Sequence, residues 1–315
     1  MRVLDSIPEN GGEGSAVTVG VFDGHHLGHR KLLETTVARA RERGIHSAVL
    51  TFREHPDLLL RGEAPPRLQT EEERMRGFEE AGIDLVLRLA FTPEFRDMEA
   101  PEFARRLLVG GLQCRALVLG FDSAICKGRS GTVDAFRRLG SELGFTAERA
   151  DAVLVDGDPV SSSRIREALR AGAVGRAALL LGRPFTFEGI VGEGARRGRT
   201  LGFPTANLSL PDLALPKPGV YAVTASPGTG GEKEERLPGV CNLGPRPTFE
   251  EERGGLAEVH LLDFDGDLYG KRLRIAFHAR IRGIHAFPDT EALAARIRRD
   301  LDEARRLLAD GPPPA

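Results

Sequence analysis

The stretch AVTVGVFDGHHLGHRKLL, residues 16–33, decides the fold of the first part of the chain. Its apolar opening predicts a buried strand over residues 16–22. A helix is predicted to begin near His29, to place Leu32 and Leu33 on one face, and to stop at Gly44. A strand that leads directly into a helix is the unit from which parallel sheets are built.

The pattern repeats along the next part of the chain. Further strands are predicted at SAVLTF (47–52), IDLVLRLA (83–90) and RALVLGF (115–121), and helices at 71–81, 99–109 and 132–143. This alternation predicts a Rossmann-like α/β domain over residues 1–181, with a parallel sheet and helices on both faces. One more helix is predicted from about Arg164 to Leu180. Ligands of such sheets bind at the carboxyl ends of the strands, where the opening stretch turns into its helix.

After GRPF (182–185) the pattern changes. Short apolar runs separated by Gly and Pro, among them GVYAVTA, AEVHLLDF and KRLRIAFHARI, replace the helical periodicity. They predict a small antiparallel, Greek-key-like barrel, followed by a terminal helix over about 290–308. The second domain is therefore expected over residues 182–309, and the tail 310–315 is expected to be disordered.

The composition excludes several classes of protein. The chain has 315 residues, of which 41% are hydrophobic and 29% charged, as expected of a soluble globular protein. A net charge of −2 argues against a general nucleic-acid binder. No apolar run approaches a membrane span, no signal peptide is recognisable, and the three cysteines form no C-x-x-C pair. We expect a cytoplasmic protein without a membrane or nucleic-acid partner, as a monomer or weak homo-oligomer.

Two predicted helices begin with cations, where the helix dipole disfavours them. The first opens with His29, Arg30 and Lys31, and the second with Arg164 and Arg166, capped by Ser162 or Ser163. A bound phosphate would reverse the unfavourable sign. The alternative for either helix alone is a surface arginine, but the two starts together favour a phosphate site.

The histidines suggest what this phosphate site does. His26-Leu27-Gly28-His29 is an H-x-G-H element, typical of nucleotidyltransferases that cleave ATP between the α and β phosphates. Imidazoles can donate hydrogen bonds to phosphate oxygens, and the glycine lets the backbone approach. A zinc site would need further ligands at a fixed spacing, which the sequence does not offer. His25, outside the element, is expected to be a loop residue.

Two further motifs lie in the second half. The loop GEGARRGR, with Gly192, Gly194 and Arg199, suits a cover over phosphates, with a solvated turn as the alternative. Thr205 and Asn207 offer hard oxygen ligands suited to Mg²⁺ on a nucleotide. Glu258 alternates with apolar residues along a predicted strand. It could be a general base in a cleft or, equally, a solvent-facing glutamate on an edge strand.

Taken together, the chain resembles the bifunctional prokaryotic riboflavin kinase/FMN adenylyltransferase family, also called FAD synthetases, from about Val17 to Leu308. The matching stretches are GVFDGHHLGHRKLL, TFREHP, VSSSRIREAL, LGRPF, GRTLGFPTANL, PGVYAV, NLGPRPTF and EVHLLDFDGDLYGK. The alternative classes are a riboflavin kinase whose N-terminal domain is degenerate and, because H-x-G-H also occurs in tRNA synthetases, an RNA-binding protein.

The resemblance implies two activities that share Mg²⁺ and ATP. The barrel would phosphorylate riboflavin to FMN, with Glu258 as general base, Thr205 and Asn207 holding Mg²⁺ with the nucleotide, and Gly192 to Arg199 covering phosphates. The N-terminal domain would join FMN to AMP from a second ATP, giving FAD and pyrophosphate. The residues implied for ATP and phosphates there are Gly20, Phe22, Asp23, Gly24, His26, Gly28, His29, Ser162, Ser163 and Arg166. Those implied for flavins are Asp122, Phe203 and Arg282.

One stretch departs from the family pattern G-x-[DN]-F-x-F-G-K-G-R. It reads GFDSAICKGR over 120–129, so that Ser123 and Ile125 replace aromatic residues and Cys126 replaces a glycine. A lost aromatic would weaken stacking on flavin or adenine, and this is the motivation for the kinase-only alternative.

Overall fold

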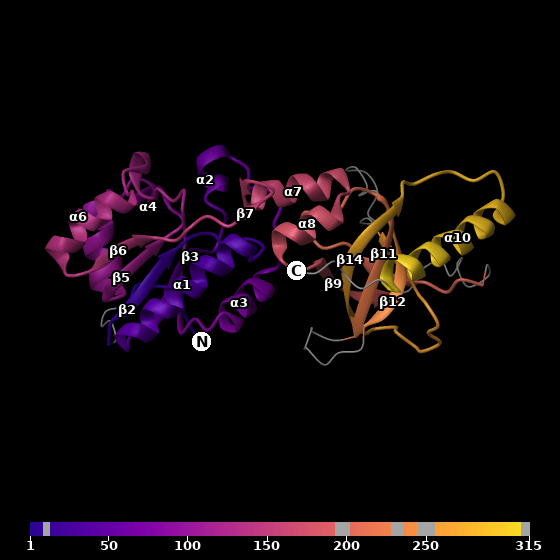
Figure 1. Ribbon diagram of the computed structural model, residues 1–315, viewed down its shortest axis with the longest axis horizontal. Coiled ribbons are helices and arrows are strands. Elements are labelled where there is room, and N and C mark those ends of the chain that lie inside the picture. The colour runs from indigo at the N-terminus through magenta and orange to yellow at the C-terminus, as the bar shows by residue number, and fades with distance from the viewer. Residues whose placement is uncertain (9–12, 193–201, 228–235, 245–255, 310–315) are drawn as a thin grey trace. The chain divides into compact units, whose positions relative to one another are not determined.

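The computed structural model describes residues 1–8, 13–192, 202–227, 236–244 and 256–309. The chain divides into two compact units, Met1–Ser161 and Ser162–Ala315, and Figure 1 shows the elements of each. No helix within these ranges is both long and apolar enough to cross a membrane.

The first unit contains a six-stranded parallel sheet. Its strands are β1 (Arg2–Leu4), β2 (Ser15–Val19), β3 (His46–Phe52), β4 (Leu85–Leu89), β5 (Cys114–Leu119) and β6 (Thr146–Arg149), in the order β1-β4-β3-β2-β5-β6. After β2, the chain adds β3 and β4 on one side of β2 and then β5 and β6 on the other side. The carboxyl end of β2 is therefore the point where the strand order reverses, which is where doubly wound sheets bind their ligands.

Helices cover both faces of this sheet (Figure 1). On one face, α1 (Leu27–Arg43) and α3 (Glu71–Glu80) pack Leu33, Val37 and Phe78 against the sheet. On the other, α5 (Ala100–Phe103), a π-helix η1 (Ala104–Gly111) and α6 (Val133–Leu143) contribute Phe103, Leu107 and Phe136. Shorter elements are α2 (Asp57–Arg61), α4 (Pro93–Arg96), η2 (Lys127–Arg129), β7 (Leu154–Val155) and β8 (Asp158–Pro159). The predicted Rossmann-like architecture is confirmed.

The second unit begins with two helices where a single helix was predicted. α7 (Ser162–Ala171) and α8 (Val174–Leu181) are separated at Gly172, which has φ 78°. A Cβ there would lie 2.9 Å from Cδ of Arg280, so glycine is required by both the backbone angle and the close neighbour. α7 begins at Ser162, so Ser162 and Ser163 lie at the start of the helix, and the role of one of them as its cap stays a prediction.

A closed antiparallel barrel follows. Its strands are β9 (Phe185–Gly192), β10 (Ala206–Ser209), β11 (Gly219–Pro227), β12 (Leu237–Leu243), β13 (Leu256–Leu261) and β14 (Arg272–Arg282), in the order β10-β13-β12-β11-β14-β9. β14 returns beside β11 after the meander β11-β12-β13, which is the Greek key connection. Helix α10 (Thr290–Ala309) packs Leu301 and Ala304 against Val220, Ala222 and Val240 of the barrel. The predicted barrel and terminal helix are confirmed.

The division between the units falls earlier than the predicted boundary after residue 181. α7 packs on α8, and α8 contacts β9 and β14, so both helices belong to the compact unit of the barrel. The boundary at residue 181 between functional domains stays a prediction, and the predicted tail 310–315 lies outside the described residues.

Candidate active sites

The turn after β2 reverses the chain into α1 by means of unusual backbone angles. Gly24 has φ 95°, and Phe22 and His25 have φ 57° and 42°, in the left-handed region that non-glycine residues rarely adopt. Gly20 enters the turn with its N–H donating to the carbonyl of Leu50, 3.1 Å away. Such angles persist only where surrounding contacts hold them.

Those contacts come from the segment that leads into α3. The carboxylate of Asp23 is buried and accepts the backbone N–H of Leu68 at 2.9 Å. The side-chain amide of Gln69 donates to the carbonyl of Phe22 at 3.0 Å. Asp23 is thus an internal support of the turn, in line with the prediction that Asp23 and Gly24 shape it.

His26 is the N-cap of α1. Its Nδ1 accepts the backbone N–H of His29 at 3.2 Å, and the two imidazoles stack with ring centroids 3.6 Å apart. A Cβ at Gly28 would lie 3.2 Å from the His26 ring, so the glycine leaves room for that ring to lie over the helix start. The structure therefore brings His26, Gly28 and His29 together as one group.

The surroundings of His29 favour the neutral form of its ring. Its ring lies 5.2 Å from that of Phe22, and its Nδ1 is buried without a hydrogen-bond partner among the described residues. Burial, and to a lesser degree His26 and His25, lowers the pKa of His29 well below 6.5. A neutral ring with unused hydrogen-bonding capacity at a helix N-terminus suits a phosphate oxygen.

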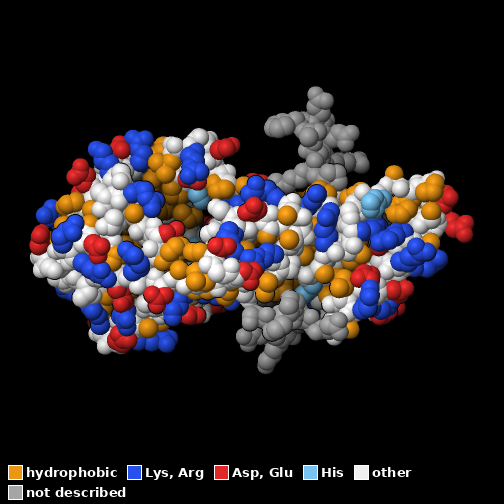
Figure 2. Space-filling model, turned by 45° about the horizontal axis from the view of Figure 1, so that its top comes forward, with side chains coloured by type: hydrophobic (Ala, Val, Ile, Leu, Met, Phe, Trp, Pro, Cys, Tyr) orange, Lys and Arg blue, Asp and Glu red, His pale blue; other side chains and the backbone are white. Residues whose placement is uncertain are grey.

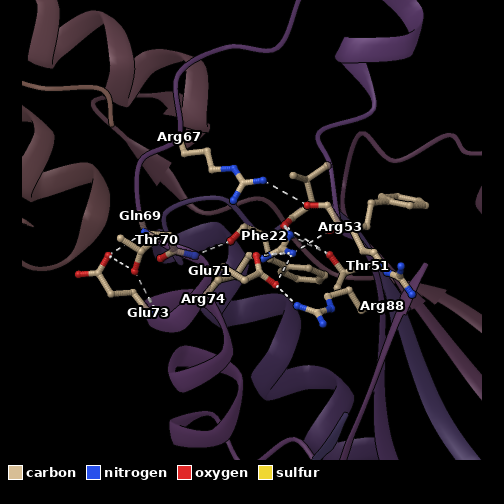
Figure 3. A network of polar contacts seen from close by, with 12 residues as sticks. Phe22, Thr51, Arg53, Arg67, Gln69, Thr70, Glu71, Glu73, Arg74 and Arg88 are labelled. Atoms are coloured by element: carbon tan, nitrogen blue, oxygen red, sulfur yellow. Dashed lines mark hydrogen bonds and ion pairs between the residues drawn. The ribbon is translucent and has the colours of Figure 1, made fainter. Parts of the chain in front are cut away.

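His25 lies in the turn before α1, as the sequence suggested, but it is not a solvated loop residue. It is buried, its Nε2 donates to the carbonyl of Arg74 at 2.9 Å, and its ring packs edge-on against Phe78. Arg74, which no sequence motif singles out, lies within a network of polar contacts (Figure 3). The signal was its spacing of four residues from Phe78, which places both on the buried face of α3.

The second predicted phosphate contact lies on α7, in the second unit. Arg166 is buried, and its carbonyl accepts the Nε–H of Arg170 at 3.3 Å. Ser162 and Ser163 begin the same helix. That these residues complete one site with the histidines stays a prediction.

The unusual stretch 120–129 forms a strained loop beside the sheet. Cys126 has φ 67° and ψ 173°, a conformation adopted almost only by glycine, which is the residue that the family pattern has there. Burial raises the pKa of its thiol to about 12, so the sulfur is unreactive. Asp122 is exposed, and its carbonyl accepts from Arg129 at 3.2 Å.

The barrel carries a row of three polar side chains. Glu258 on β13 is paired directly with Asn207 on β10 and with Asn242 on β12. Residues paired in this way project from the same face of a sheet. The amide of Asn242 donates to Oε2 of Glu258 at 3.0 Å, and Glu258 raises the pKa of the buried Cys241 thiol beyond the effect of burial. Glu258 is half-buried on a strand with a neighbour on each side, so the edge-strand alternative is wrong.

One member of this row, Asn207, lines a cavity of about 520 Å³, to which β13 contributes Val259 and Leu261 and not Glu258. Thr205 and Asn207 line it, together with Val191 and the loop from Phe264 to Tyr269. Asn207 thus belongs both to the cavity and to the row that contains Glu258. Gly192, at the end of β9, is paired with Asn207, whereas Gly194 and Arg199 lie outside the described residues.

Two predicted flavin residues of the barrel have protein partners. The ring of Phe203 meets His260 edge-on, with centroids 6.0 Å apart. Arg282 forms an ion pair with the buried Asp300 of α10, with 2.8 Å between Nη2 and Oδ2, and lies over the ring of Phe287.

The donor atoms near the cavity suit magnesium more than a transition metal. Within the described ranges, no group of three or more His, Cys, Asp or Glu side chains could hold a metal ion. A hydroxyl and an amide oxygen are hard ligands, and Mg²⁺ typically takes only one or two protein ligands beside nucleotide phosphates. Thr205 and Asn207 fit that pattern.

Fold and site together define a two-domain enzyme that combines a nucleotidyltransferase-like sheet with a kinase barrel. A family model described as FAD synthetase matches residues 9–164, and one described as riboflavin kinase matches residues 181–308. The chain belongs to the family of bifunctional riboflavin kinase/FMN adenylyltransferases.

Similar proteins span nearly the whole chain. The bifunctional riboflavin kinase/FMN adenylyltransferase of Pseudomonas fluorescens is 40% identical over 94% of this chain and 94% of its own. The enzyme of the same name from Escherichia coli K12 is 37% identical over 98% of this chain and 97% of its own. A crystal structure titled as a macrolide-efflux protein from Streptococcus pneumoniae superposes with a TM-score of 0.85, at 27% identity, over 96% of this chain and 98% of that one.

These comparisons confirm the predicted family. Because both the FAD synthetase and the riboflavin kinase domains are present, the bifunctional prediction is confirmed over a kinase with a degenerate N-terminal domain.

Proposed function

We propose that the chain makes FAD from riboflavin in two ATP-dependent steps, with the barrel acting first and the α/β unit second. The observation that carries the kinase half is the row Asn207–Glu258–Asn242, whose Asn207 lines the cavity. For the second half it is the stacked pair His26–His29 at the carboxyl end of β2, in which burial favours the neutral form of His29.

In the kinase step, Glu258 accepts the proton of the riboflavin 5′-hydroxyl as that oxygen attacks the γ-phosphorus of ATP, the bond from this phosphorus to the bridging oxygen breaks, and ADP leaves with that oxygen. Asn242 holds one carboxylate oxygen at 3.0 Å and so leaves the other for the substrate. Mg²⁺, when bound by Thr205 and Asn207, would neutralise charge on the phosphates. Gly192, Gly194 and Arg199 would cover the nucleotide, and Phe203 and Arg282 would border the flavin.

In the adenylyltransferase step, the FMN phosphate attacks the α-phosphorus of ATP and pyrophosphate leaves. His26 and His29 would donate hydrogen bonds to the phosphate oxygens, so the protein contributes positioning and charge stabilisation without a covalent intermediate. Gly20, Phe22 and Gly24 shape the ATP-binding turn, with Gly28 at the helix start. Ser162, Ser163 and Arg166 would bind the departing phosphates, and Asp122 would border FMN.

The proposal extends to the domain bounds, cellular location and partners of the enzyme. We propose functional domains over residues 1–181 and 182–309, and a cytoplasmic monomer or weak homo-oligomer that does not bind nucleic acid. On the face of the molecule in Figure 2, Asp and Glu side chains are scattered among the Lys and Arg side chains, which supports the last point.

The test is to incubate the purified chain with riboflavin, ATP and Mg²⁺ and to separate the flavins by chromatography. FMN followed by FAD is expected. FMN without FAD would overturn the second step, and no FMN would overturn the first. Glu258→Ala should abolish FMN formation but leave FMN-to-FAD conversion, and His29→Ala should do the reverse.

A further inference from the structure

Arg74 binds the carboxyl ends of two neighbouring strands at once. From α3, its guanidinium donates to the carbonyl of Val21, just after β2, at 2.9 Å, and to the carbonyl of Phe52, the last residue of β3, at 2.7 Å. It also donates to the Thr51 hydroxyl at 3.3 Å (Figure 3). The side chain is 8% exposed, so these bonds form away from solvent.

The charge of Arg74 is balanced by a chain of ion pairs across the sheet edge. Glu71 lies 2.8 Å from Arg74 and also accepts from Arg88 of β4 at 3.0 Å. Arg88 in turn donates to Asp5, just after β1, at 2.9 Å. Asp5, Arg88, Phe52 and Val21 follow the strand order β1-β4-β3-β2, so one network connects four strands to the turn that carries the histidines.

The backbone of Arg74 supports that turn as well. Its carbonyl accepts the Nε2–H of His25, whose φ of 42° needs outside support. Arg74 therefore contacts both ends of the segment Val21–His25: the side chain binds its first residue and the main chain its last. His26, the cap that stacks on His29, is the next residue along the chain.

We propose that Arg74 is a positioning residue of the adenylyltransferase, which fixes the turn Val21–His25 so that His26 and His29 meet the phosphates of ATP. The proposal rests on the proposed role of these two histidines. Arginine suits the task because its planar fork reaches two carbonyls and a carboxylate together, whereas lysine directs all its hydrogen bonds from one nitrogen.

The test compares Arg74→Lys and Arg74→Met with Arg76→Gln in the full-length chain. Arg76 lies on the same helix and pairs with Glu72 at 3.1 Å, outside this network. Arg74→Lys should raise the KM for ATP in FMN adenylylation and lower kcat/KM by about tenfold to a hundredfold. Arg74→Met should lower kcat/KM further. Riboflavin phosphorylation should stay within about twofold in all three variants, since its residues lie in the other unit.

A purely structural role would give a different result. Loss of folded molecules lowers kcat in proportion to the active fraction and leaves the KM for ATP unchanged. An unchanged KM in Arg74→Lys would therefore overturn the proposal, and this variant decides the question if Arg74→Met fails to fold.

His29→Ala, measured in the same assays, distinguishes a failure of the proposed histidine site from a failure of the positioning role of Arg74. If His29→Ala keeps full adenylyltransferase activity, the proposed histidine site itself is wrong. If His29→Ala is inactive while Arg74→Lys behaves as the wild type, only the positioning role is wrong.

Discussion

The imidazole of His26 stacks on that of His29 at 3.6 Å while its Nδ1 accepts the backbone N–H of His29. Two protonated rings at this distance would repel each other, and the helix N-terminus would add to the repulsion. The arrangement therefore adds to the effect of burial, which is the main reason that the pKa of His29 is lowered.

This lowering predicts how stability depends on pH. Below about pH 6.5 the unfolded chain protonates His29 while the folded chain resists, so stability falls as the pH falls through that value. Urea unfolding at about pH 7.5 and about pH 5.5 should show a smaller loss in His29→Gln than in the wild type. The exposed His285 provides the control, because His285→Gln should keep the wild-type pH dependence. Equal losses in all three would contradict a buried neutral His29.

Replacing Glu258 by glutamine tests the general base. Glu258→Gln keeps the size of the side chain but cannot accept the substrate proton, so riboflavin phosphorylation should fall by about 10²–10⁴-fold. Asn242→Ala, which removes only the 3.0 Å bond that orients the carboxylate, should cause a smaller loss. Both rates are measured as FMN formed, with adenylylation of supplied FMN as the internal control. A Glu258→Gln variant that retained its kinase rate would exclude this assignment.

Asn207 should govern the magnesium requirement of the kinase. We expect Asn207→Ala to raise the Mg²⁺ concentration for half-maximal riboflavin phosphorylation by about tenfold or more. Asn242→Ala removes the same amide from the opposite side of Glu258 and should leave this concentration unchanged. A magnesium titration of both variants at fixed ATP distinguishes them, and identical curves would argue against Asn207 as a ligand.

Cys126 offers a test of backbone strain. Because its φ of 67° and ψ of 173° suit glycine, Cys126→Gly should gain part of the roughly 1–3 kcal/mol stored there. The melting temperature of the α/β unit should rise by about 2–4 °C. Cys126→Ala removes the sulfur but keeps the backbone strain, so the melting temperature of this variant should not rise. If alanine stabilises as much as glycine, removal of the thiol and not relief of strain is the cause.

The sequence predicted the parts of the fold that rest on apolar periodicity. β2 to β5 are buried runs that any parallel sheet requires, and the helices between them show one apolar face. The edge strands β1 and β6 were missed, since RVL and TAER are short and only partly apolar. The predicted helix 164–180 contains Gly172, whose left-handed φ separates α7 from α8 and whose close neighbour Arg280 leaves no room for a Cβ, and neither fact shows in the sequence.

The sites were predicted to the extent that each motif is local in sequence. His26, Gly28 and His29 lie within one helical turn, so their spacing already indicates their geometry. Asn242 and Arg74 act through partners 16 and 53 residues away, Glu258 and Val21, and single-sequence patterns contain no such distances. An arginine in EEERMRGFEE reads as surface charge until the helix is seen to bury that side.

The division at Ser161 and Ser162 has a consequence for exchanging parts between relatives. A fragment that begins at Ser162 takes with it Ser163 and Arg166, the predicted phosphate contacts of the adenylyltransferase, because α7 packs with α8 and the barrel. A chimera joined there would transplant a piece of one enzyme's active site together with the other enzyme. The proposed functional boundary after residue 181 thus lies two helices, α7 and α8, beyond the start of the compact unit that holds the barrel, and a cassette designed on the proposed roles would end after α8.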